Sequence, residues 1–129
     1  MNIHDLPQLF NATTKFKIGS FTRDISLASS NQSVSGVGFT PRAILFLASV
    51  PGTFPMSIGF DDNTDVGVLN STNGTVFSAN TTASIRLLTD AANFYDGTIT
   101  ALDVDGFTIV WTRTGVQAGT ATIIYFAIR

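Results

Sequence analysis

The densest group of side chains that could do chemistry lies in the segment FDDNTDVG, residues 60–67. Within five positions it carries four carboxylate or amide side chains, those of Asp61, Asp62, Asn63 and Asp65. Carboxylate and amide oxygens are the ligands that a hard cation such as Ca²⁺ takes, but the segment lacks the glycine and the distant glutamate of an EF-hand loop. Asp and Asn are also common in turns, because their side chains bond to the backbone that follows. We therefore predict a solvated turn with no metal or cofactor, and cation binding is the alternative.

Residues for covalent or acid–base catalysis are scarce. Nucleophilic catalysis by Ser or Thr needs a base, usually a histidine, held in place by a third group. The only histidine is His4, and the chain has no cysteine and no glutamate. A pair of catalytic carboxylates would have to come from nine aspartates that lie mostly in turn contexts. The sequence thus predicts no catalytic residues and no enzyme, and a hydrolase of cell-wall sugars is the one enzymatic alternative.

Composition excludes several classes of partner. The 129 residues are 44% hydrophobic and 12% charged, with a formal net charge of −2. Nucleic-acid binding requires clustered Lys and Arg, and the seven basic residues are spread singly along the chain. No apolar run reaches membrane-spanning length, and the first residues lack the basic start and apolar run of a secretory signal. We expect a protein made in the cytosol that binds neither nucleic acid nor membrane.

Short runs of β-forming residues recur from Lys15 onward, separated by clusters of Asp, Asn, Thr and Gly. The runs cover residues 15–21, 32–39, 42–50, 56–60, 74–79, 83–88, 97–104, 107–114 and 120–129. This spacing is typical of an all-β sandwich or barrel. We predict an antiparallel β-sandwich, jelly-roll-like, of about eight to ten strands over residues 15–129, preceded by an extended arm at residues 1–14. Jelly-roll and immunoglobulin-like strand orders share this spacing, so the order stays open.

Two runs are apolar at successive positions, residues 43–48 and 123–128, which is typical of central strands covered on both sides. The segment 82–95 has a weak helical pattern, but its turn formers favour a strand followed by a loop. Residues 103–106, DVDG, indicate a tight hairpin because Asp-Gly tolerates positive φ angles.

Aromatic residues are expected to fill the core. Trp111, the only tryptophan, shares strand parity with Phe107 and Ile109, so we predict a structural role rather than a ligand platform. Six phenylalanines in or beside the β runs are predicted to complete the sandwich core. They are Phe16, Phe39, Phe46, Phe60, Phe107 and Phe126.

Four apolar residues outside the strands are candidates for partner binding. Leu6, Leu9 and Phe10 lie in the arm, where Pro7 bars a long helix, and we expect the arm to dock on a neighbouring chain. Phe54 stands between two loop prolines, where an exposed apolar contact and a ring folded back over the core are equally compatible with the sequence.

A family resemblance rests on three groups of residues. The first is a Gly-Phe-x-Pro-x-Ala segment, formed by Gly38, Phe39, Pro41 and Ala43. The second is an Asp-Gly-Phe segment with a later tryptophan, formed by Asp105, Gly106, Phe107 and Trp111. The third is the closing pair Tyr125 and Ala127. Over residues 16–129 the chain resembles a family of small virion proteins of tailed bacteriophages and their prophages, to which no catalytic residues are attached.

The resemblance implies a structural component of a phage head or tail. We expect a capsid decoration or cement protein that binds the major capsid protein on the outer head shell as a homo-oligomer, a trimer, assembled in the host cytoplasm. The alternative is a tail-fibre or spike domain that binds host glycans, with Phe94, Tyr95 and Asp96 or the 61–65 loop as its site.

Overall fold

The computed structural model describes residues 15–53, 55–72 and 76–129. These residues form ten β-strands, which are β1 (Phe16–Asp24), β2 (Ser30–Ser35), β3 (Ala43–Ser49), β4 (Met56–Asp61), β5 (Val66–Thr72), β6 (Val76–Asn80), β7 (Ile85–Asp90), β8 (Asn93–Asp103), β9 (Gly106–Thr114) and β10 (Thr120–Ile128). Within the same ranges no helix is both long and apolar enough to cross a membrane.

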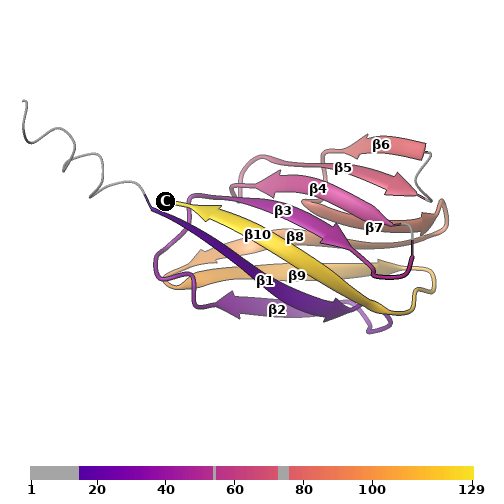
Figure 1. Cartoon of the computed structure of the whole chain (residues 1–129), viewed down its shortest axis with the longest axis horizontal. Helices are drawn as coiled ribbons and strands as arrows, with labels where there is room; N and C mark the ends of the chain where they lie inside the picture. Colours follow the sequence, from indigo (N-terminus) through magenta and orange to yellow (C-terminus); the bar gives the residue numbers. More distant parts are fainter. Residues whose placement is uncertain (1–14, 54, 73–75) are drawn as a thin grey trace, which may run out of the picture.

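The strands make two layers. Six form a sheet in the order β1-β10-β3-β4-β5-β6, and four form a second sheet in the order β2-β9-β8-β7. Figure 1 looks onto the outer face of the six-stranded sheet, with the second sheet behind it. All the pairings are antiparallel, so the predicted β-sandwich is confirmed. The nested pairs β1–β10 and β2–β9 resemble the start of a jelly roll, whereas β3 to β6 and β7 to β9 follow as consecutive hairpins.

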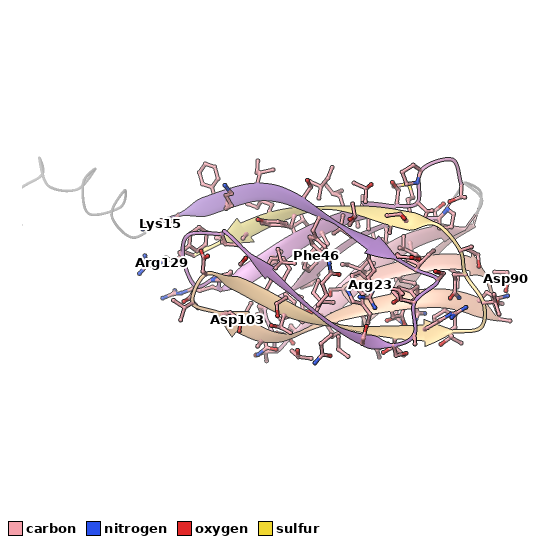
Figure 2. The ribbon with its side chains drawn as sticks, turned by 90° about the horizontal axis from the view of Figure 1, so that it is seen from below. Lys15, Arg23, Phe46, Asp90, Asp103 and Arg129 are labelled. Atoms are coloured by element: carbon pink, nitrogen blue, oxygen red, sulfur yellow. The ribbon has the colours of Figure 1, made fainter. Side chains whose placement is uncertain are left out.

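The core lies between the layers and is rich in aromatic rings. Phe107 meets the rings of Phe46 and Tyr125 edge to face, with centroids 5.6 and 5.3 Å apart. Both phenylalanines are fully buried, and Phe46 lies between the sheets in Figure 2. Trp111 is also fully buried, as are Phe107 and Ile109 on the same face of β9, which confirms the predicted register. Removal of these rings from water is a main source of the fold's stability.

The contact between β4 and β7 decides which way β4 faces. A side chain at Gly59 would overlap the carbonyl group of Ser84, just before β7, so only glycine permits this approach. The hydroxyl of Ser57 accepts a hydrogen bond from the Arg86 backbone N–H at 3.3 Å. Because the inward positions of β4 are occupied by small and polar residues, its large ones, Ile58 and Phe60 among them, face outward.

Several sequence predictions need correction. Residues 43–48 and 123–128 do lie in central strands, but in the single chain only one face of each is covered. Of the six phenylalanines expected in the core, Phe39, Phe46 and Phe107 are buried. Phe16 and Phe60 are exposed, and Phe126 is half-buried on the outer face. These three rings share outward parity, and the second sheet covers only the inward side.

One strand and one strand boundary also differ from expectation. Strand β5 was not predicted, because Gly67, Asn70 and Ser71 are poor strand formers and only pairing with β4 and β6 orders them. Strand β8 begins at Asn93 rather than Gly97, and pairs with β7 in a hairpin. The segment 82–95 is therefore a strand, as favoured, followed by a short turn and a second strand instead of a loop.

Candidate functional site

The carboxylates of the loop after β4 stabilise the fold. Asp61 is buried, and its Oδ2 accepts a hydrogen bond of 2.9 Å from the backbone N–H of Ile99 in the opposite sheet. Its Oδ1 accepts one of 2.8 Å from Asn63 N–H. The strand β8 has a bulge after Ile99, where its ladder is interrupted. Asp61 therefore ties the two sheets together at this irregularity.

The neighbouring Asp62 stabilises the turn itself. Its Oδ1 accepts backbone N–H bonds from Asp65 at 2.7 Å and Thr64 at 2.9 Å. These bonds hold the pKa of the Asp62 carboxyl below its ordinary value. Asn63 takes a positive φ of 69°, which asparagine tolerates better than most residues. Within the described ranges no three acidic or histidine side chains are grouped so that they could hold a metal. The loop has the predicted turn geometry, but Asp61 is buried rather than solvated.

A second aspartate joins two of the segments that carried the family resemblance. Asp105 accepts backbone N–H bonds from Gly38 at 2.6 Å and from Gly36 at 3.0 Å. Both glycines have a positive φ of 87°, so this loop needs glycine. The two bonds lower the pKa of Asp105. The hairpin between β8 and β9 thus fixes the loop that leads from β2 into β3.

Trp111 belongs to a buried cluster around a cation. Its ring stacks on Tyr95 with centroids 5.4 Å apart, and its Nε1 donates to Gln32 at 2.9 Å. Arg23 is buried, and its guanidinium carbon lies 5.7 Å from the centroids of both rings. The guanidinium donates to the Tyr95 hydroxyl at 2.8 and 2.9 Å and to Ser30 at 2.6 Å. These contacts hold the cation inside the sandwich, as Figure 2 shows for Arg23, and leave no open groove beside Trp111.

The residues suggested for glycan binding are engaged with one another. Tyr95 is fully buried in the cluster around Arg23. Asp96 makes a two-bond ion pair with Arg86, with distances of 2.8 and 2.5 Å, and this pairing raises the pKa of Arg86. The Arg86 guanidinium also lies 4.6 Å from the centroid of the Phe94 ring. Phe94 is half-buried, and both carboxylate oxygens of Asp96 are bonded to Arg86. The 61–65 loop has the turn bonds described above.

The largest feature that sequence reasoning missed is an apolar surface on the six-stranded sheet. Ten large hydrophobic residues point outward from five adjacent strands and are 39 to 66% exposed. We call this surface the outer face, and its ten residues are Phe16, Ile18, Leu45, Leu47, Met56, Ile58, Phe60, Leu69, Ile124 and Ile128. The opposite sheet instead turns outward a polar surface rich in threonine, including Thr98, Thr108 and Thr112. The sequence did contain a signal for the outer face. The runs 43–48 and 123–128 are apolar at successive positions, so they place apolar side chains on both faces of the sheet.

The four residues predicted to bind a partner, Leu6, Leu9, Phe10 and Phe54, lie outside the described residues.

Some basic residues that are far apart in the sequence lie close together in the fold. Arg129 N–H donates to Lys15 C=O at 2.9 Å, and Arg42 N–H donates to the Ile128 carbonyl at 2.7 Å. Lys15 and Arg129 thus lie together at one end of the sandwich (Figure 2), while the outer face between its ends carries no charge on its central strands.

Comparison with known proteins adds one structural likeness. No protein-family model and no curated protein matches the chain. Among solved structures, the chain is similar to part of a tailspike protein of Acinetobacter baumannii bacteriophage Fri1, a capsular polysaccharide depolymerase. The match has 12% identity and a TM-score of 0.38, and it covers 88% of this chain. The chain spans 17% of the length of that tailspike.

Proposed function

We propose that this chain is a structural protein of a bacteriophage virion, and specifically a capsid decoration protein that binds the major capsid protein on the outer head shell as an oligomer. The observation that carries the oligomeric part of the proposal is the outer face, an apolar surface of the β-sandwich with no charge on its central strands. A large exposed apolar patch marks an interaction site in soluble proteins. The resemblance of the chain to small phage virion proteins is the basis for proposing a phage virion as its location.

The other prominent side chains support binding rather than catalysis as the mode of action. Asp61, Asp105 and the Arg23 cluster each stabilise the fold through contacts that occupy their polar atoms. A decoration protein needs only such a scaffold with adhesive surfaces. Many copies on one shell also turn a modest affinity per contact into firm attachment, because neighbouring contacts act together.

Binding to purified heads tests this function. Heads would be prepared from a phage that lacks the gene, mixed with the purified full-length chain, and separated by sedimentation. We expect saturable binding to heads, with a stoichiometry fixed by the shell lattice, and density for the chain on the outer shell by electron microscopy. Binding to host cells or their surface glycans, with none to heads, would overturn the proposal in favour of a tail adhesin.

The same experiment can test the role of the N-terminal arm, residues 1–14. We expect deletion of residues 1–14 to leave the sandwich folded, since the described core begins after Lys15. Under the predicted docking role, the truncated chain binds heads more weakly than the full chain. Equal binding of the two chains would refute the docking role of the arm without refuting decoration.

A further inference from the structure

The outer face is continuous across the six-stranded sheet. Cross-strand partners link its residues in rows, so that Ile124 pairs with Leu47, Leu47 with Ile58, and Ile58 with Leu69. The next row joins Ile18, Phe126, Leu45 and Phe60 in the same way. Figure 1 views this surface directly, with β10, β3 and β4 at its centre. The side chains therefore form one patch rather than separate exposed residues.

The patch has the size of a protein interface. Its ten large side chains are about half exposed. At ~180 Å² for a fully exposed side chain of this size, they present roughly 900 Å² of apolar surface. That area exceeds the few hundred Å² usual on a monomer, and it matches the ~800 Å² that each partner contributes to a standard stable interface.

The charge pattern favours a second copy of the same chain as the occupant. The outward positions of β10, β3, β4 and β5 that the structure describes hold no Asp, Lys or Arg. A partner recognised through charge would find no complement here. A surface placed against its own copy, however, meets like residues with like, and the absence of charge removes the repulsion that this would otherwise cause.

The shape of the face also suits self-association. At one side the rings of Phe16 and Phe126 stack with centroids 5.6 Å apart, and Phe126 is paired with Ile18 of β1. Phe16 and Ile18 are 66 and 63% exposed, and we call these three residues the ridge. At the other side a hollow of about 350 Å³ lies around Gly67, lined by Leu45, Ile58, Phe60 and Leu69 among others. A ridge and a hollow on one surface allow each copy to fill the hollow of its neighbour.

We propose that the outer face is the contact between copies of this chain, with the ridge of one copy in the hollow of the next. The inference deepens the proposed function, on which it rests for the expectation of an oligomer. Facing sheets in proteins pack ~10 Å apart with interdigitating side chains, which this face provides. A dimer and the trimer expected from the sequence would both use this contact. If the measured oligomer is a dimer, it replaces the expected trimer.

Analytical ultracentrifugation of the full chain tests the inference. We expect the wild-type chain to sediment as an oligomer at micromolar concentration. Ile58→Asp places a charge at the centre of the contact, and we expect it to raise the dissociation constant by at least about thirty-fold. The matched control is Val110→Asp, a half-buried position on the outward side of β9, which should leave the oligomer intact.

Folding is checked for each variant by circular dichroism and thermal unfolding. If Ile58→Asp fails to fold, Ile58→Thr keeps the β-branched shape without the charge and should still weaken association relative to Val110→Thr. A wild-type chain that is monomeric at tens of micromolar overturns the inference, as does equal dissociation by the two aspartate variants. Binding of a monomeric chain to phosphatidylcholine vesicles would assign the face to a lipid instead.

The outcomes separate this inference from the proposed function. An oligomer that does not bind heads would refute decoration and leave the contact between copies standing. A monomer that binds heads would refute the contact and leave head binding standing.

Discussion

Replacement of Asp61 by alanine removes a buried link between the two sheets. In the wild type its carboxylate accepts the N–H of Ile99 from β8 and the N–H of Asn63 in the adjoining turn. Asp61→Ala leaves both donors without this partner. Ile99 is buried beside the bulge of β8, so no solvent is at hand to replace the lost acceptor.

The cost follows from the two bonds. A buried N–H that loses a charged acceptor costs about 1.5–3 kcal/mol, and the partly buried turn bond of Asn63 adds about 0.5–1 kcal/mol. We therefore expect Asp61→Ala to lower the free energy of unfolding by roughly 2–4 kcal/mol. Asp61→Asn retains one acceptor oxygen and should lose about 1–2 kcal/mol.

Urea unfolding followed by circular dichroism measures these losses. The matched control is Asp62→Ala, which removes a neighbouring carboxylate that also accepts two backbone N–H bonds but is more exposed. Because the N–H groups of Thr64 and Asp65 can bond to water instead, Asp62→Ala should cost clearly less than Asp61→Ala. The slope of the unfolding free energy with urea should be the same for all variants.

An Asp61→Ala loss no larger than that of Asp62→Ala would refute the reasoning. Unfolding repeated with added CaCl₂ examines the alternative use of the loop. Since the oxygens of Asp61 face the protein interior, we expect no rise in the unfolding midpoint with Ca²⁺. A rise that grows with Ca²⁺ concentration and disappears in Asp61→Ala would show instead that the loop is a cation site.

Three further predictions concern single residues. Gly59→Ala should destabilise the fold by more than about 2 kcal/mol because its methyl group would overlap Ser84, whereas Gly67→Ala, on the outer face of the next strand, should be nearly neutral in the same urea experiment. Asp105→Asn should reduce stability at neutral pH but not in strong acid, since the benefit of a lowered pKa is complete above the ordinary value of 3.8 and is lost as pH falls through the lower folded value; parallel curves of midpoint against pH would contradict this. The fluorescence of buried Trp111 should be blue-shifted and resist iodide quenching, and Trp111→Ala should cost about 3–5 kcal/mol; ready quenching in the folded chain would place the ring at the surface.

Local patterns in the sequence were sufficient for most strands and for the core around Trp111. Alternation along β9 places Phe107, Ile109 and Trp111 on one face, and the Asp-Gly turn marks the hairpin before it. These features depend on residues close together in the chain, so they can be recognised without knowledge of the fold. The same hairpin brings Asp105 into contact with Gly36 and Gly38 in the loop after β2. No local sequence pattern predicts that contact.

Local patterns could not predict which side chains of β4 point inward and which point outward. In the segment MSIGFD the apolar residues alternate regularly, which ordinarily directs them to the core. Here the inward side is taken by Gly59 and Asp61, because β7 approaches too closely for large side chains and the bulge of β8 needs an acceptor. Both causes lie in strands distant in sequence, and the same is true of the outer face that results.

The pairing of β1 with β10 brings the two ends of the sandwich fold to one place. Phe16 lies opposite Ile128, and the N–H of Arg129 bonds to the carbonyl of Lys15. A peptide or fluorescent protein fused before Lys15 or after Arg129 would therefore emerge from the same pole, with the turn at Asp90 at the opposite pole (Figure 2). The domain could for this reason be circularised by a short linker, or used to display cargo in one direction, without disturbing a strand.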